Sequence, residues 1–141
     1  MQTLADMRHQ LPAVLYGGSR CAGIMRDGRR PDAVERGLGM FGLFVRFTCK
    51  DEAAATAFDE LVARTGEQIR ANEPGTVIYA VHRVDGRPLQ RAFYELYRDE
   101  AAFDEHESKD YVRAFLSERE RYLSATEVDR LDFVSGKGVE G

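Results

Sequence analysis

A glutamate, a tyrosine and a histidine follow one another closely in the second half of the sequence, in a pattern suited to acid–base chemistry. Glu95 and Tyr97 lie in an apolar stretch, and His106 follows shortly after them. An imidazole exchanges protons near neutral pH, and a buried carboxylate can orient the imidazole or act as a base itself. A phenol can donate a hydrogen bond to an anion. We therefore predict His106, Glu95 and Tyr97 as catalytic residues.

Five further side chains are predicted to bind a substrate: His82, Phe93, Phe103, Tyr111 and Arg113. The two phenylalanines would wall an apolar cavity, and the tyrosine would donate a hydrogen bond. The arginine would pair with an anionic substrate, and the histidine would be a reserve base.

Structural roles would also explain the same residue types. His106 could cap a helix end, and Glu95 could hold backbone groups at a junction. The aromatic side chains could simply be core residues, whereas His82 and Arg113 could be solvated. The sequence leaves these alternatives open.

The composition excludes several classes of function. The formal net charge is -4 and no basic stripe is present, so we expect no nucleic-acid partner. No run of roughly eighteen apolar residues occurs, so we expect no membrane span. The two cysteines, Cys21 and Cys49, lie far apart with no cluster of histidines beside them. We therefore expect neither a disulfide framework nor a metal site, and a cytoplasmic location.

The N-terminal segment differs in character from the rest of the chain. Residues 1–39 contain six glycines and no hydrophobic period that persists beyond a turn or two. Such a segment buries too little apolar surface to offset its ordering entropy. We expect a flexible or partly helical extension over 1–39, a folded domain over 40–135 and a tail over 136–141. The extension could be a lid, a dimer-embracing arm or dispensable, and translation could begin at Met40.

From residue 40 onward, the hydrophobic pattern predicts a regular series of elements. They are a strand over 41–48, a helix over 51–72, strands over 76–84 and 89–97, a helix over 99–106, a helix capped by Ser108, and a strand over 126–134. A broken second helix completes the order β-α-β-β-α-β. This order predicts an α+β, ferredoxin-like fold with an antiparallel four-stranded sheet.

The predicted strands are apolar on both faces. In the first strand, Phe41, Leu43 and Val45 alternate with Gly42 and Phe44. Helices can cover only one face of so small a sheet, so the other face needs a cover. A second copy packed sheet against sheet is the simplest one. We therefore predict a homodimer formed through the sheet faces.

Two motifs carry a resemblance to a known family. Residues 73–79, Glu-Pro-Gly-Thr-Val-Ile-Tyr, look like the pattern E-x-G-x-x-x-Y at a helix-to-strand junction. Residues 94–106 look like E-x-[aromatic]-x-[ST/D]-x-x-A-x-x-x-H, and Ser108 and Phe115 continue this signature. Over residues 40–135, the chain resembles the antibiotic biosynthesis monooxygenase family. The resemblance implies a dimeric α+β barrel.

The resemblance also implies a reaction. Oxygenases of this family need neither flavin nor metal: the anion of an electron-rich phenol, hydroquinone or anthrone passes an electron to dioxygen. It thus implies a cofactor-independent monooxygenase of an aromatic polyketide, hydroquinone or anthrone, with dioxygen as co-substrate. Haem is not implied, because Phe115 stands where the haem-degrading branch carries its axial histidine. An acid–base isomerase or cyclase, and a non-enzymatic dimer that binds small molecules, remain alternatives.

The implied pocket lies between the sheet and its own helices, so strand parity predicts which side chains share it. A two- or four-residue turn at residues 85–86 places the odd-numbered residues 93–97 on one face with the even-numbered residues 78–82. Tyr79 and Tyr94 would then lie on the other face. A three-residue loop would exchange the partners in the second strand.

Overall fold

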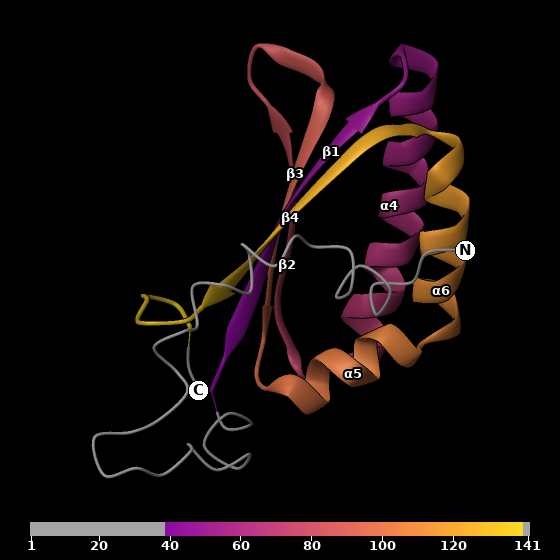
Figure 1. The fold of residues 1–141 in the computed structure, drawn as a ribbon. Helices are drawn as coiled ribbons and strands as arrows, with labels where there is room; N and C mark the ends of the chain where they lie inside the picture. The colour runs from indigo at the N-terminus through magenta and orange to yellow at the C-terminus, as the bar shows by residue number, and fades with distance from the viewer. Residues whose placement is uncertain (1–38, 140–141) are drawn as a thin grey trace, which may run out of the picture.

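Four antiparallel strands form one sheet, in the order β2-β3-β1-β4, in the computed structural model, which describes residues 39–139 (Figure 1). The strands are β1 (Phe41–Cys49), β2 (Thr76–Val84), β3 (Arg87–Tyr97) and β4 (Leu123–Asp132). Within these residues the strands are connected by the helices α4 (Glu52–Asn72), α5 (Glu100–Ser108) and α6 (Asp110–Glu118), and by the 3₁₀ turn η2 (Arg119–Arg121). The order confirms the predicted α+β, ferredoxin-like fold. Apart from Gly39, the predicted N-terminal extension lies outside the described residues.

Helix α4 begins and ends as its sequence predicts. The Asp51 side chain accepts a hydrogen bond from the Ala54 amide at 2.7 Å, which caps the first turn. At the other end, the Glu73 amide donates to the Ile69 carbonyl oxygen at 3.0 Å. The chain then turns into β2 at Gly75, where a Cβ atom would lie 2.6 Å from the Cβ atom of Ala102 in α5. Only glycine allows so close an approach of α5 to this junction.

An aromatic core joins the inward face of the sheet to the helices. The ring of Phe47 in β1 contacts Phe58 of α4 and Phe93 of β3 edge-on, with centroid distances of 5.3 and 4.8 Å. Phe41 contacts Phe103 of α5 in the same way at 5.4 Å. Each such pair contributes about 0.5–1.5 kcal/mol beyond its buried area. The core therefore holds α4 and α5 firmly on the sheet.

The outward face of the sheet is also largely apolar, and none of the helices in residues 39–139 packs on it (Figure 1). Strand pairing places Phe44, Ala80 and Tyr94 side by side on this face, and all three are partly exposed. Leu131, from β4, is 37% exposed. The strands thus carry apolar side chains on both faces of the sheet. The homodimer remains a prediction.

The register of β2 against β3 corrects the predicted grouping of side chains. Tyr79 lies opposite Glu95, and Val81 lies opposite Phe93, so the odd-numbered residues of both strands share the inward face. The prediction had placed the even-numbered residues of β2 there. His82 therefore lies on the outward face, away from Glu95, and Tyr79 lies on the inward one.

An irregularity close to the hairpin turn causes this exchange. The two-residue turn forms as predicted, and Val84 pairs with Arg87 on either side of it. The next pair along β2, however, joins Arg83 to Arg91, so residues 88–90 have no partner in β2. β3 thus contains three residues more than β2 at this point. Because side chains alternate between the two faces of a strand, an odd number of extra residues changes which residues of β2 and β3 share a face in every later pair.

Two element ends also differ from the predictions. Ser108 does not cap α6: its hydroxyl donates to the Glu105 carbonyl oxygen at 2.6 Å, within α5, and α6 follows Lys109. Strand β4 begins three residues earlier than predicted and ends at Asp132, whereas Val134 is 91% exposed. Neither difference changes the fold.

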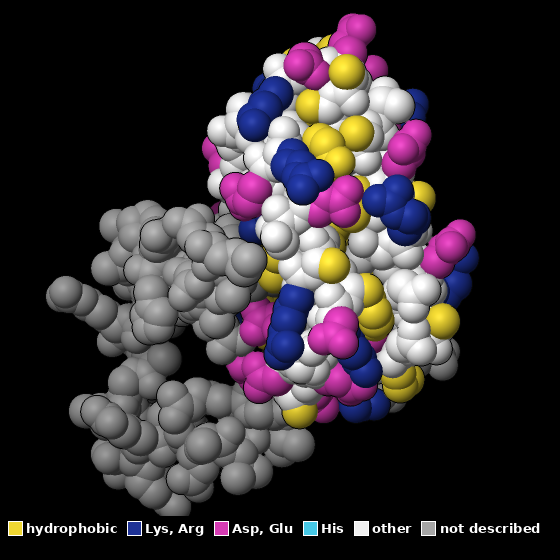
Figure 2. All heavy atoms as spheres, turned by 90° about the vertical axis from the view of Figure 1, so that its right-hand side faces the viewer, with side chains coloured by type: hydrophobic (Ala, Val, Ile, Leu, Met, Phe, Trp, Pro, Cys, Tyr) yellow, Lys and Arg dark blue, Asp and Glu magenta, His cyan; other side chains and the backbone are white. Residues whose placement is uncertain are grey.

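The helix side of the molecule presents both signs of charge. Figure 2 shows Lys and Arg side chains interspersed with Asp and Glu over this side, with small hydrophobic spots between them. Such a surface has no continuous basic stripe that would follow a nucleic-acid backbone. Among residues 39–139, no helix has the length and apolar character needed to cross a membrane.

Candidate functional site

A buried carboxylate at the end of α4 gathers hydrogen bonds from three other elements. Glu73 Oε2 accepts from the Thr76 hydroxyl at 2.7 Å and lies 2.7 Å from His106 Nδ1. Glu73 Oε1 accepts from the Tyr111 hydroxyl at 2.6 Å. Thr76 opens β2, and the other two partners come from α5 and α6. We call these four residues the Glu73 cluster.

The Glu73 cluster fixes the state of the imidazole. Burial alone would raise the pKa of Glu73, but the hydrogen bonds outweigh burial and lower it, so the side chain is an ionised carboxylate at neutral pH. An ionised carboxylate only accepts hydrogen bonds, so Nδ1 of His106 must carry the hydrogen. In the neutral imidazole, Nε2 then keeps a lone pair that can take up a proton.

A second buried carboxylate lies in the middle of β3. The Tyr97 hydroxyl donates to Glu95 Oε2 at 2.5 Å, and both side chains are buried. Burial raises the pKa of Glu95, although His106 and Tyr97 oppose the rise. Burial, followed by the nearby Glu95 charge, also raises the pKa of Tyr97 well above its ordinary value. Both members of this pair therefore hold their protons more tightly than the same groups do in water.

A small cavity lies between the sheet and the helices. His106, from the Glu73 cluster, and Glu95 both line it. Its volume is about 20 Å³. The polar side chains that line it are Tyr79, Glu95, His106 and Arg119, with Thr65 beside them, and the rest of the wall is apolar. Within this cavity an imidazole, a carboxyl group, a phenol and a guanidinium are together in apolar surroundings.

Arg119 of η2 brings a positive charge into this interior. Its guanidinium lies over the rings of Phe47 and Phe115, at 5.5 and 6.0 Å from their centroids. The residue is only 3% exposed. Burial lowers the pKa of Arg119, and the charges of Glu120 and Glu95 oppose that change. An arginine keeps its charge even when it is buried, so the cavity contains a fixed cation.

The structure brings most of the predicted site residues together. His106 and Glu95 line the cavity, and the Tyr97 ring lies 5.3 Å from the imidazole. Phe103 contacts both Tyr97 and His106, at 5.1 and 6.5 Å between ring centroids. Tyr111 belongs to the Glu73 cluster. Their catalytic and binding roles stay predictions.

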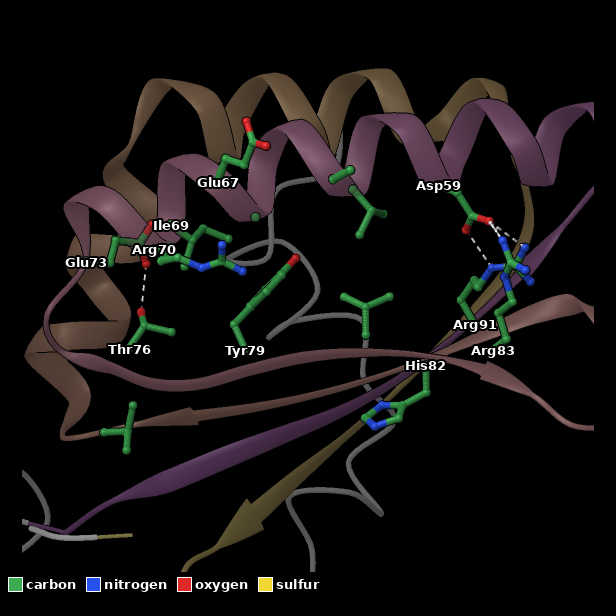
Figure 3. A pocket seen from close by; sticks show the side chains of 15 residues that line it. Asp59, Glu67, Ile69, Arg70, Glu73, Thr76, Tyr79, His82, Arg83 and Arg91 are labelled. Atoms are coloured by element: carbon green, nitrogen blue, oxygen red, sulfur yellow. Dashed lines mark hydrogen bonds and ion pairs between the residues drawn. The ribbon is translucent and has the colours of Figure 1, made fainter. Parts of the chain in front are cut away.

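Three predicted binding residues lie elsewhere. Phe93 is buried in the aromatic core, where it contacts Phe47. His82 is exposed and projects from the far side of β2 (Figure 3). The side chain of Arg113 is 65% exposed on α6 and lies 4.0 Å from Asp110. The structure does not place His82 or Arg113 at the cavity.

Three residues of the site were missed as functional candidates from the sequence. Glu73 and Tyr79 open and close the motif at residues 73–79, so a signal for both was present. For Arg119 the sequence gives no such signal, because this arginine sits in a run of charged residues. Only the tertiary structure shows that its guanidinium is buried.

Among residues 39–139, no group of three or more His, Cys, Asp or Glu side chains is arranged to hold a metal ion. The one cysteine in this range, Cys49, is buried and not in a disulfide. The expected absence of a bound cofactor stays a prediction.

Comparison with known proteins identifies relatives of this fold. Residues 40–118 match the model of the family described as "Antibiotic biosynthesis monooxygenase". A crystal structure from Caulobacter crescentus CB15, named for the same family, is 24% identical, with a TM-score of 0.66, over 72% of this chain and 96% of that one. Rv0793 from Mycobacterium tuberculosis is 19% identical, with a TM-score of 0.64, over 70% of this chain and 99% of that one. At such identities, the likeness shows the fold. No protein with a curated function matches the sequence.

Proposed function

The chain belongs to the antibiotic biosynthesis monooxygenase family, and from that premise we propose that it oxygenates an electron-rich aromatic compound without a bound cofactor. The proposed substrates are phenols, hydroquinones and anthrones, including those of aromatic polyketides, and the proposed co-substrate is dioxygen. The observation that carries this proposal is the 2.7 Å contact between Glu73 and His106 Nδ1. That contact leaves Nε2 as a base beside an apolar cavity.

The first step would be removal of a proton from the substrate by His106. The resulting anion is a far better electron donor than the neutral phenol or anthrone. Because Glu73 is ionised and buried beside the imidazole, it stabilises the imidazolium that forms, as an aspartate does in a serine protease triad. Glu95, whose pKa is raised, is the second candidate for the base.

The anion needs electrostatic stabilisation inside the domain. Arg119, which lines the cavity, supplies a fixed positive charge. Preorganised donors and charges act strongly where water is excluded. Most of the other residues that line the cavity are apolar, which favours the exclusion of water.

In the oxygenation, the substrate anion transfers an electron to dioxygen, and the two radicals combine into a carbon-bound peroxide anion. This anion takes a proton back from the His106 imidazolium, which regenerates the base. Loss of water from the peroxide leaves a carbonyl group at that carbon. For an anthrone, the methylene group and dioxygen become a carbonyl group and water. One oxygen atom enters the product, and the other leaves as water.

The test is oxygen consumption with a panel of hydroquinones and anthrones, on the wild type and on His106→Ala. We expect the substitution to lower kcat/KM by about 10²–10⁴-fold, the usual contribution of a general base, with an unchanged far-ultraviolet circular dichroism spectrum. Activity that survives the substitution would remove His106 as the base. Turnover without dioxygen would favour an isomerase or cyclase, and ligand-induced stabilisation without product would favour a binding protein.

We further propose a cytoplasmic homodimer formed through the outward face of the sheet. The partly exposed Phe44, Ala80 and Tyr94 support this assembly, because apolar surface of this kind is usually covered. Light scattering after size exclusion should give twice the chain mass of 15.9 kDa. A stable species of one chain mass would contradict the dimer.

A further inference from the structure

An open groove runs along the surface between α4 and β2, on the outer side of the candidate site (Figure 3). Its volume is about 750 Å³. Apolar side chains line it from both elements, including Val62 and Ile69 from α4 and Val81 from β2. Polar and charged side chains lie at both ends of the groove: Glu67, Arg70, Glu73 and Thr76 at one end, and the ion-paired Asp59, Arg83 and Arg91 at the other. This combination suits an aromatic ligand with a polar edge.

Tyr79 separates this groove from the small inner cavity. It is the one residue, among those that the structure describes, that lines both spaces. In Figure 3 its side chain rises from β2 toward α4. Its ring contacts Phe93 at 5.8 Å and His106 at 6.3 Å between centroids. The ring therefore forms the partition between the surface and the candidate base.

The sizes of the two spaces require a route between them. The inner cavity, at about 20 Å³, has room for about one water-sized molecule. A phenol or anthrone ring cannot enter it while Tyr79 stays in place. The groove lies within the usual range for small-molecule sites, roughly 300–1,000 Å³. Because Tyr79 alone lines both spaces among the described residues, a substrate that rests in the groove would have to displace the Tyr79 ring to reach His106.

Tyr79 is placed on an element that permits such movement. β2 is an edge strand and pairs only with β3 in the described sheet. Within residues 39–139, no hydrogen bond holds the Tyr79 hydroxyl, whereas the Tyr97 and Tyr111 hydroxyls are each held by a carboxylate. Rotation of the Tyr79 ring therefore breaks ring contacts and no hydrogen bond.

We propose that Tyr79 is a gate, and that the groove between α4 and β2 is an outer binding site where the aromatic substrate docks before it passes the gate. The ring system lies against Ile69 and Val81, with its polar edge toward Arg70 and Thr76. The inference deepens the proposed function and rests on it for the identity of the substrate class. Tyr79 would thus limit the size of substrate that reaches His106.

The test uses 1-naphthol as the probe, without dioxygen, so that binding is observed without turnover. Stopped-flow fluorescence gives the association rate constant, and the imidazole signals of His106 in nuclear magnetic resonance spectra report arrival in the cavity. We expect Tyr79→Ala to raise the association rate constant by about tenfold, because gated binding is slow. Tyr79→Phe should stay within about twofold of the wild type, because the ring and not the hydroxyl closes the cavity.

A matched pair of substitutions on α4 tests the groove without altering the partition. Ala63 is exposed and lines the groove, whereas Ala71 is exposed on the same helix and does not line it. Ala63→Trp should slow naphthol binding by about tenfold or more, and Ala71→Trp should leave it within about twofold. This pair keeps the proposal testable if Tyr79→Ala fails to fold.

Two results would overturn the proposal. In the first, Tyr79→Ala and Ala63→Trp both leave the association rate constant unchanged, and naphthol still shifts the His106 signals. Naphthol would then reach His106 by a route that passes neither the groove nor Tyr79. The other is the absence of any His106 shift in all variants up to the solubility limit of naphthol. A failure of the oxygenase proposal would look different. The protein would then consume no oxygen with any substrate of the panel, but Tyr79→Ala and Ala63→Trp would still change the rate of naphthol binding.

Discussion

Glu73 and Glu95 are both buried carboxyl groups near the same imidazole, yet their surroundings move their pKa values in opposite directions. Glu73 closes α4, where three side chains from β2, α5 and α6 bind its two oxygens. Glu95 lies within β3 and receives a hydrogen bond from Tyr97. The pKa of Glu73 is lowered, and that of Glu95 is raised. Glu73 has more hydrogen-bond donors than Glu95 and is less deeply buried, and the two differences together separate their pKa values.

The difference assigns separate tasks to the two acids. An ionised Glu73 orients His106 and stabilises its charged form, and it is too weak a base to take a proton near neutral pH. Glu95 exchanges its proton closer to neutrality, so it can take part in proton transfer. Pairs of acids whose environments separate their pKa values commonly divide acid–base roles in this way.

The largest expected effect on stability is that of Glu73→Ala. The substitution leaves His106, Tyr111 and Thr76 without their shared acceptor in the interior. We expect the free energy of unfolding at pH 7 to fall by about 3–5 kcal/mol, measured by urea denaturation. Glu60→Ala, at an exposed position of the same helix, is the control and should change it by less than about 0.5 kcal/mol. A loss below about 1 kcal/mol would show that the cluster contributes little.

A smaller effect, with a characteristic pH dependence, is expected for Glu73→Gln. Glutamate in an unfolded chain has a pKa of about 4.3, and the folded value is lower. The stabilisation is therefore present above pH 4.3 and is lost as the pH falls through the folded pKa. At pH 7 the variant should be about 2 kcal/mol less stable than the wild type, and the gap should narrow as the pH falls below about 4.3 and through the folded pKa. A gap that stays constant down to pH 3 would argue against an ionised Glu73.

The opposite sign is expected for Glu95→Gln. Because the folded pKa of Glu95 is raised, ionisation opposes folding, and the wild type loses stability as the pH rises from about 4.3 through the folded value. Glutamine imitates the neutral acid and can still accept from Tyr97. The variant should equal the wild type near pH 4 and exceed it by about 1 kcal/mol at pH 8. Thermal melts across this range measure the difference, and a less stable variant at pH 8 would reverse the assignment.

The smallest effect is expected at Arg113, which was predicted to bind the substrate. Its side chain is largely exposed, and its contact with Asp110 is long. Arg113→Ala should change the free energy of unfolding by less than about 0.5 kcal/mol and kcat/KM by less than about twofold. A tenfold rise in KM would restore it as a binding residue.

The fold could be predicted because its signals are local. Asp51 caps α4, and the apolar stripe of that helix recurs with a helical period that ends at the Glu73-Pro74-Gly75 sequence. The hairpin turn at residues 85–86 follows from its Asp-Gly pair. Each of these signals lies within a few residues of the element that it defines.

The strand register could not be predicted, because it depends on an irregularity in β3 that lies beside a tertiary contact. The Arg91 guanidinium donates to the carbonyl oxygens of Pro88 and Gln90, within the irregular part of β3. It also donates to Asp59 of α4 at 2.6 Å, which ties β3 to the helix (Figure 3). The pairing of Arg91 with Asp59 is a tertiary interaction that no local pattern reveals. The register that follows this irregularity places Tyr79, and not His82, on the inward face.

The cluster around Glu73 was hidden for the same reason. Its motif was visible, but its hydrogen-bond partner Tyr111 lies 38 residues away in the sequence. The residues predicted for their chemistry, His106 and Glu95, do reach one cavity. What the sequence could not show was which of the nearby acids binds the imidazole.

The central claim is that Glu73 holds the hydrogen of His106 on Nδ1 and leaves Nε2 as the base. Nitrogen-15 nuclear magnetic resonance of histidine-labelled protein at pH 8 reports the tautomer of this imidazole directly. We predict a protonated Nδ1 and an unprotonated Nε2 in the wild type, with the preference weakened in Glu73→Gln. A wild-type imidazole that carries its hydrogen on Nε2 would contradict the account.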